Sequence, residues 1–304
     1  MRQTAIIIVS RERYSLLASC LESIQDNHKG NVKVYVGCDS DDPKTLEVAK
    51  KYRATVAVTK PTTNRHHALF NPISRRVDCD YIFTLNDDVT VHTKDFGTVI
   101  EATIEDFLED KPGRIVYGRT QESWPGVPDL HPHYDAKVDM EQQMGFKFAC
   151  YPIMTKETIN CLGFVMPDEI PDCGADVELG SVFNTLKCSN IVPRHDRYLD
   201  IPIAIHDHTG NSEVTRSSGP DPVQQHYYAW HGGHVMKSLV NLSKHIEEAR
   251  TQREMRDSDY SFLCMHLPID TRINKRNGVS LPPGVHPQRA SWRNADADLE
   301  WHNL

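Results

Sequence analysis

Four short apolar runs, separated by segments with helical spacing, occupy the first 85 residues of the chain. Between the first two runs, apolar residues recur at three- and four-residue intervals from Leu16 to Ile24, which is typical of an amphipathic helix. Strands that alternate with helices form βαβ units, whose strands lie parallel in one sheet. The pattern therefore predicts an α/β fold with a mostly parallel central sheet. The apolar runs lie at residues 5–9, 32–36, 55–58 and 81–85.

The fourth run ends abruptly in one amide and two carboxylates, which are Asn86, Asp87 and Asp88. A buried strand cannot hold two adjacent carboxylates unless a cationic group meets them. In open α/β folds, ligands bind at the carboxyl edge of the parallel strands. We therefore expect a metal-and-phosphate site at this strand end, with a solvated turn as the plainer alternative. The G-x-G-x-x-G fingerprint is missing after the first run, so a dinucleotide fold has no support.

The composition is that of an ordinary soluble globular protein, with 304 residues, 39% hydrophobic and 25% charged. A formal net charge of −8 argues against wholesale wrapping of nucleic acid, but it allows a local basic patch. The eight cysteines form no C-x-x-C pair, so a zinc knuckle or thioredoxin motif is not supported. No apolar run reaches the length of about 18 residues that a membrane span needs. We expect a soluble, cytoplasmic protein.

Further along the chain, local signals predict the remaining elements. Asp42 and Pro43 have the residue types of a helix cap and of a first helical turn. Apolar residues from Val235 to Ala249 have amphipathic helical spacing, and residues 272–293 carry five Lys or Arg and no acid. We expect helices near 68–77, 96–108, 156–162 and 172–179, strands near 115–118, 146–154 and 201–205, and a long loop at 119–143.

Four motifs follow one another in a specific order along residues 4 to 180. Together they resemble the GT-A glycosyltransferases, in particular the family 2-like inverting enzymes of the D-x-D type. In this sequence the motifs are Val36-Gly37-Cys38-Asp39, a segment with Asn64, Ala68 and Asn71, then Leu85-Asn86-Asp87-Asp88, and finally Gly174-Ala175-Asp176-Val177-Glu178-Leu179.

The resemblance implies a metal-dependent enzyme that moves a sugar from a nucleotide-diphosphate donor, by default a UDP-sugar, to an acceptor hydroxyl with inversion. We assign a GT-A catalytic domain to 1–215. The helical spacing and the acid-free segment beyond it predict a helical extension with a basic, irregular tail at 216–304. Asp176 is the expected general base, with Glu178 or Asp172 as alternatives. Two positions depart from the family pattern: Asn86 stands where an Asp is more common, and Ala175 stands where an acid usually precedes the base.

The donor and the metal each have candidate ligands. The resemblance gives Asp39 contact with the nucleoside, and a base role for Asp39 stays open. Asp87 and Asp88 suit a divalent cation, and an imidazole ligand favours Mn²⁺ over Mg²⁺. His206 and His208 end the strand predicted at 201–205, so either is a candidate metal ligand; an exposed polar turn is the alternative. Candidate donor contacts are Asp39, Asn64, Arg65, Asn86 and Asp87, and Arg65 has a solvated surface charge as its alternative.

The acceptor stays open. The acid-free tail at 272–293 would bind phosphates, so a hydroxymethylated base in DNA is one candidate acceptor. No membrane insertion is expected. Two other functions are compatible with strand-end acids and histidines. One is a metal-dependent nucleotidyltransferase or phosphohydrolase, and the other is a non-catalytic module that binds a nucleotide sugar or DNA.

Overall fold

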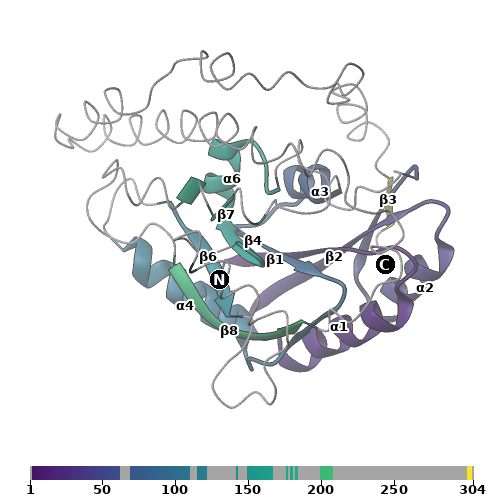
Figure 1. Cartoon of the computed structure of the whole chain (residues 1–304), viewed down its shortest axis with the longest axis horizontal. Helices are drawn as coiled ribbons and strands as arrows, with labels where there is room; N and C mark the ends of the chain where they lie inside the picture. The colour runs from purple at the N-terminus through teal and green to yellow at the C-terminus, as the bar shows by residue number, and fades with distance from the viewer. Residues whose placement is uncertain are drawn as a thin grey trace.

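The computed structural model describes residues 2–61, 69–109, 115–121, 149–166 and 199–207, together with 142, 176, 179–180, 182–183 and 300–302. These residues form a nine-stranded sheet with helices on both of its faces (Figure 1). The strands are β1 (Gln3–Val9), β2 (Asn31–Asp39), β3 (Thr55–Thr59), β4 (Tyr81–Asn86), β5 (Val89–Val91), β6 (Tyr117–Gln121), β7 (Pro152–Thr155), β8 (Leu199–Asp207) and β9 (Glu300–His302). The helices are α1 (Tyr14–Asn27), α2 (Pro43–Lys51), α3 (Phe70–Arg76), α4 (Phe96–Leu108) and α6 (Lys156–Leu162).

The sheet has the strand order β5-β8-β6-β7-β4-β1-β2-β3-β9. Strands β4, β1, β2 and β3 are parallel neighbours. Strand β7 runs antiparallel between β4 and β6, and β8 lies parallel to β6. The short strands β5 and β9 pair antiparallel with β8 and β3. The prediction of an α/β fold with a central sheet flanked by helices is confirmed. Its parallel part is β4-β1-β2-β3, and the rest of the sheet is mixed.

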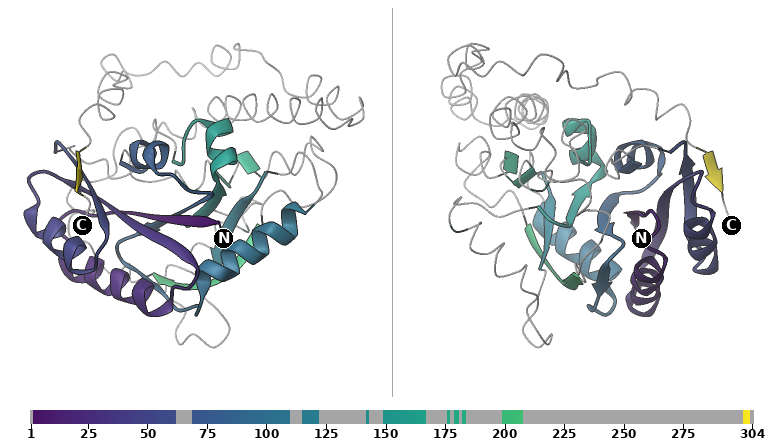
Figure 2. Two further views of the ribbon diagram at one scale, coloured as in Figure 1. Left: turned by 180° about the vertical axis from the view of Figure 1, so that it is seen from behind. Right: turned by 45° about the vertical axis from the view of Figure 1, so that its right-hand side comes forward.

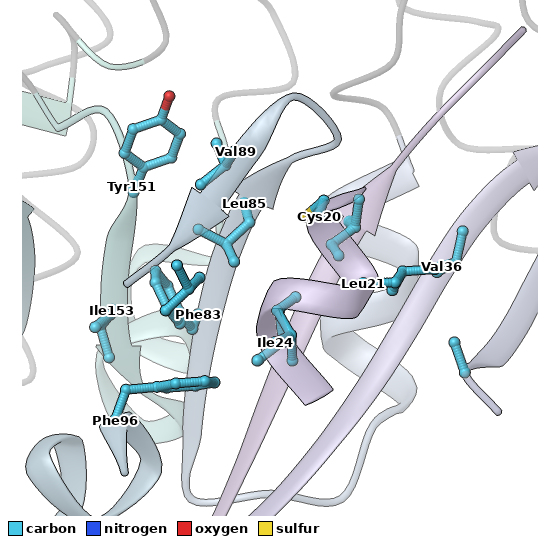
Figure 3. Close-up of a cluster of buried hydrophobic side chains, with 14 of the residues drawn as sticks. Cys20, Leu21, Ile24, Val36, Phe83, Leu85, Val89, Phe96, Tyr151 and Ile153 are labelled. Carbon is cyan, nitrogen blue, oxygen red and sulfur yellow. The ribbon is translucent and has the colours of Figure 1, made fainter. Parts of the chain in front are cut away.

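Alternation along β1 divides the core into two layers. Ile6 and Ile8 belong to a buried cluster with residues of α1 and α4, such as Leu21 and Phe96 (Figure 3). Ile7 belongs to a second cluster that includes residues of α3 and α6. Helices α1, α2 and α4 therefore cover one face of the sheet, and α3 and α6 cover the other (Figures 1 and 2). Each fully buried side chain of this kind contributes about 1.5–3 kcal/mol relative to an exposed one.

The helix start predicted at Asp42 and Pro43 is confirmed. The Asp42 side chain accepts a hydrogen bond from the Thr45 N–H at 3.3 Å and from the Thr45 hydroxyl at 2.6 Å. Pro43 is the first residue of α2 and needs no hydrogen-bond partner there, because it has no N–H. These contacts begin α2 directly after the end of β2 and its terminal acid, Asp39.

Three features differ from the sequence prediction. Strand β6 continues to Gln121, into the range expected to be a loop, because it pairs with both β7 and β8. Strand β7 begins at Pro152 rather than near residue 146. Strands β5 and β9 were not predicted, since three-residue strands have no internal periodicity. The boundary at 215–216 and the helix at 235–249 lie outside the residues that the structure describes. No helix in the described part of the chain is long and apolar enough to cross a membrane.

Candidate functional site

The candidate site lies where β1 is flanked by β2 and β4. Val9, the last residue of β1, pairs with Gly37 of β2 on one side and with Asn86 of β4 on the other. Helix α1 follows β1 on one face, and α3 packs on the opposite face. The helices next to β1 therefore lie on opposite faces of the sheet. Such a position is a topological switch point, where the carboxyl ends of the strands leave a crevice for ligands.

Three buried acids gather at this edge. Asp39, Asp87 and Asp88 have exposed fractions of 5%, 2% and 6%. Asn86 is exposed and lies beside Val9, so the strand end presents an amide to solvent and keeps the two acids beneath the surface. Buried carboxylates at such positions need cationic or hydrogen-bonding partners. The loop between β1 and α1 supplies these partners.

Arg13 in this loop contacts both adjacent acids. Its Nη1 lies 2.7 Å from Asp87 Oδ1, and its Nη2 lies 2.5 Å from Asp88 Oδ2. The Ser10 hydroxyl donates to the other oxygen of Asp87 at 2.7 Å. The planar guanidinium suits this forked contact, which a lysine could not reproduce. Arg13 and Ser10 therefore provide one cationic and one hydrogen-bonding partner for the buried acid pair.

Arg11 makes the corresponding contact on the β2 side. It forms an ion pair with Asp39 and a second one with Asp41 at 3.1 Å. The hydrogen bond to Asp39 and the nearby charges raise the pKa of Arg11, so it stays protonated. Between the two arginines, Glu12 has a left-handed backbone with φ of 56°, and its N–H donates to Asp42 at 2.8 Å.

Within the described part of the chain, two carboxylate oxygens of the site receive no hydrogen bond. Among the described residues, Asp39 Oδ1 and Asp88 Oδ1 are buried and accept no hydrogen bond. Burial raises the pKa of Asp87 to about 6, while Arg13 and Ser10 act in the opposite direction. Acceptors of this kind suit an N–H donor of a ligand or a cation.

The acid pair is chemically suited to a hard divalent cation. Such ions often take one or two carboxylates and complete their shell with water and phosphate oxygens. The Oδ1 of Asp88 accepts no hydrogen bond from the described residues and is the candidate ligand atom, although it is buried and Arg13 already contacts both acids. Within the described ranges, no three His, Cys, Asp or Glu side chains come together as a metal cluster.

Strand β8 brings His206 toward the same edge. His206 pairs with Thr90, and Asp207 pairs with Val89, the residue directly after Asp88. The His206 ring lies against His92, with 6.3 Å between ring centroids. Burial and the neighbouring His206 lower the pKa of His92. His208, the other predicted metal ligand, lies outside the described residues, as do Asn64 and Arg65.

Asp176 contacts the segment that directly precedes β7. Its backbone carbonyl accepts from the Ala149 N–H at 2.9 Å, and the Cys150 thiol lies 3.8 Å from its Oδ2. Cys150 lies just before β7, which pairs antiparallel with β4 from Thr155 opposite Tyr81 to Ile153 opposite Phe83. Asp176 therefore lies against the segment that leads into β7.

Asn71 connects α3 to the segment after α6 through hydrogen bonds. Its side chain accepts from the N–H groups of Val165 and Met166 at 2.8 and 3.0 Å, and donates to the Met166 carbonyl at 2.6 Å. It is fully buried and anchors to α3 the segment that leads toward Asp176. Asn71 belongs to one of the motifs that carry the resemblance, and in the structure its hydrogen bonds hold two parts of the fold together.

Sequence reasoning missed the residues that hold the acids. Ser10, Arg11 and Arg13 directly follow the first apolar run, and no role was predicted for them. Two arginines separated by one residue, directly after a buried strand, were the available signal. Their partners become evident only when the strand order places β1 between β2 and β4.

Comparison with known proteins gives both family and structural matches. The family model described as glycosyl transferase family 2 matches residues 5–164. The 1–349 fragment of S. aureus TarS, in complex with UDP-GlcNAc, is 11% identical with a TM-score of 0.54; the match covers 82% of this chain and 74% of that one. No curated protein sequence matches the chain.

A second structural match is the mannosyltransferase PcManGT from Pyrobaculum calidifontis, in complex with GDP-Man and Mn²⁺. It is 12% identical with a TM-score of 0.48, and the match covers 87% of this chain and 79% of that one. At such identities the likeness concerns the fold alone. The TarS match supports a GT-A arrangement of sheet and helices.

Proposed function

The chain belongs to glycosyltransferase family 2, and we propose that it transfers a sugar from a nucleotide-diphosphate donor, bound across the ends of β2, β1 and β4, to an acceptor hydroxyl. The observation that carries this proposal is the group of three buried acids, Asp39, Asp87 and Asp88, at neighbouring strand ends. Two of them retain an open oxygen, one on the β2 side and one on the β4 side. A nucleoside and a diphosphate would occupy these two sides.

The β2 side would bind the nucleoside. Asp39 Oδ1 is a buried acceptor, and the ring N–H of uracil is a matching donor. Arg11 holds the other oxygen of Asp39 and thereby fixes the orientation of the carboxylate. The UDP-GlcNAc in the TarS complex makes a UDP-sugar the first donor to test. The exposed Asn86 would contact the ribose or the sugar at the centre of the site.

The β4 side would hold the diphosphate. Asp88, with support from Asp87, would ligate a divalent cation that neutralises the departing diphosphate. His208 is the preferred additional ligand, because the preceding residue, Asp207, pairs with Val89 next to Asp88. His206 is the second candidate, and an imidazole ligand would favour Mn²⁺ over Mg²⁺. Asn64 and Arg65 remain proposed donor contacts.

Asp176 would act as the general base. It would accept the proton of the acceptor hydroxyl while the acceptor oxygen bonds to the anomeric carbon and the bond from that carbon to the diphosphate breaks. Attack from the face opposite the leaving group gives inversion. Its contacts with Ala149 and Cys150, in the segment that leads into β7, support this proposal. The acceptor is a separate question, and a hydroxymethylated base in DNA stays a candidate because of the basic segment at 272–293.

Nucleotide release tests the proposal. The protein is incubated with UDP-sugars and GDP-mannose, with and without Mn²⁺, and with hydroxymethylated or unmodified DNA duplexes as acceptors. Release of nucleoside diphosphate should require the cation, and Asp88→Asn should lower the rate by about 100-fold. Asp26→Asn, at an exposed position near the end of α1, is the matched control and should leave the rate unchanged.

Three outcomes would point elsewhere. Release of pyrophosphate or inorganic phosphate would assign a nucleotidyltransferase or phosphohydrolase. Donor binding without release from any nucleotide sugar would indicate a non-catalytic binding module. Equal rates with and without Mn²⁺ would contradict the metal requirement.

A further inference from the structure

Arg13 contacts both carboxylates of the acid pair, as a bound metal cation would. Its two guanidinium nitrogens bridge the adjacent carboxylates Asp87 and Asp88 at 2.7 and 2.5 Å. The side chain of Arg13 is 25% exposed, whereas those of the two acids are only 3% and 7% exposed. The Arg13 side chain is therefore the most exposed of the three, although its Nε is buried.

The charges at this point are incompletely balanced. Two carboxylates and one guanidinium leave a net charge of −1, with Asp88 Oδ1 open. A divalent cation added at that oxygen would lie beside a fixed positive charge, in surroundings where burial limits screening. The cation and Arg13 together would exceed the charge of the two acids. A diphosphate carries the negative charge that removes this excess.

The backbone of Arg13 is fixed by the start of α1. Arg13 is the residue directly before α1, and its carbonyl accepts the Leu17 N–H at 3.0 Å in the first helical turn. Helix α1 has 14 residues and no acid in its first turn, so its positive end adds to the positive potential next to Arg13. Both features favour a polyanion over a lone metal ion at this end of the site.

We propose that Arg13 makes divalent-cation binding at Asp87 and Asp88 depend on the donor's diphosphate. Without donor, Arg13 holds the acids and the cation binds weakly. When a nucleoside diphosphate binds, its phosphates attract the guanidinium away from the acids, and the cation takes its place. Arg13 is then a residue that contacts the leaving diphosphate. This inference rests on the proposed donor site.

Binding measurements separate this role from a purely structural one. Mn²⁺ affinity is measured by electron paramagnetic resonance of the free ion, with and without UDP, and is corrected for Mn²⁺–UDP complexes in protein-free solution. In the wild type, UDP should tighten Mn²⁺ binding by about tenfold or more. Arg13→Met should tighten the binding of Mn²⁺ alone by about tenfold and abolish most of the enhancement by UDP. Lys29→Met is the matched control, because Lys29 pairs with Asp95 at an exposed position.

The Mn²⁺ affinities of the Arg13 variants either support or overturn the role of Arg13. Equal affinities for Mn²⁺ alone in the wild type and a folded Arg13→Met would overturn the role of Arg13. If Arg13→Met does not fold, Arg13→Lys decides instead, since it keeps the charge but loses the forked contact. It should bind Mn²⁺ alone more tightly than the wild type, and unchanged or weaker binding would overturn the inference. A wild type that binds neither UDP nor Mn²⁺–UDP would refute the donor site itself, and the dependent inference with it.

Discussion

Glu12 shows how single residues set the geometry of the site. Its left-handed backbone costs about 1–2 kcal/mol for a residue with a Cβ, and its N–H is held by Asp42. On either side of it, Arg11 turns to Asp39 and Arg13 turns to the acid pair of β4. Strained backbone of this kind persists where the surrounding contacts hold it, as they do at many functional sites.

The role of Asp176 can be tested at the same scale. Asp176→Asn should lower kcat by about 10²- to 10⁴-fold, since an amide cannot accept the proton. Donor affinity should be nearly unchanged, because Asp39, Asp87 and Asp88 are untouched. Steady-state kinetics together with UDP calorimetry measure both quantities. Asp172→Asn and Glu178→Gln serve as parallel variants, and a rate loss confined to either would reassign the base.

At the scale of elements, α2 depends on its cap. Asp42 receives hydrogen bonds from Thr45 and from the Glu12 N–H, so it joins the helix start to the loop of the site. Burial acts to raise the pKa of Asp42, but these hydrogen bonds outweigh it and hold the pKa below its ordinary value. A lowered pKa stabilises the fold above the unfolded value of about 3.9, and this contribution is lost as the pH falls through the folded value.

Asp42→Ala should therefore lower the free energy of unfolding by about 1–2 kcal/mol at neutral pH. The difference from the wild type should shrink as the pH falls below about 4, because the protonated carboxyl loses much of its advantage. Urea denaturation at neutral and acidic pH measures this difference in the free energy of unfolding. Glu47→Ala, at an exposed position of the same helix, is the control. A difference in stability between Asp42→Ala and the wild type that stays constant with pH would contradict the role of the Asp42 charge.

Helix α3 is tied to the segment after α6 by Asn71. Asn71→Ala should lower the free energy of unfolding by about 2–4 kcal/mol, because it leaves the buried N–H groups of Val165 and Met166 without their acceptor. Hydrogen exchange at these two amides should become faster. Asn31→Ala, a truncation of a half-buried amide on β2, is the comparison. Unchanged exchange would mean that other contacts hold the segment.

At the scale of the whole molecule, local patterns predicted much of the fold. The elements from β1 to β4 and α4 were predictable because their spacing, caps and strand ends lie within short windows. The acids of the site were predictable for the same reason, since carboxylates at the end of a buried strand have few structural explanations. The ion pairs of Arg11 and Arg13 were not, because they join segments that only the strand order brings together. Strand β9 was missed for a similar reason.

Strand β9 brings the far end of the chain back to the sheet. It pairs with β3, and Trp301 makes an edge-to-face contact with Tyr35 at 5.8 Å between ring centroids. Trp301→Ala should lower the free energy of unfolding by about 1–3 kcal/mol and expose the edge of β3 to other chains. Denaturation and light scattering test both effects, with His302→Ala as the control. Unaltered stability would show that β9 contributes little to holding the sheet together.

The buried thiol of Cys20 can report how often the core of the molecule opens. Its thiol lies 3.6 Å from the Asn86 carbonyl, directly beneath the strand end that carries the acids. Burial raises the pKa of Cys20 well above its ordinary value, and thiol reagents react only with the thiolate. Cys79 and Cys161, which are partly exposed, should be labelled first. The delay before Cys20 is labelled would report how often α1 separates from the sheet, with no probe added to the chain.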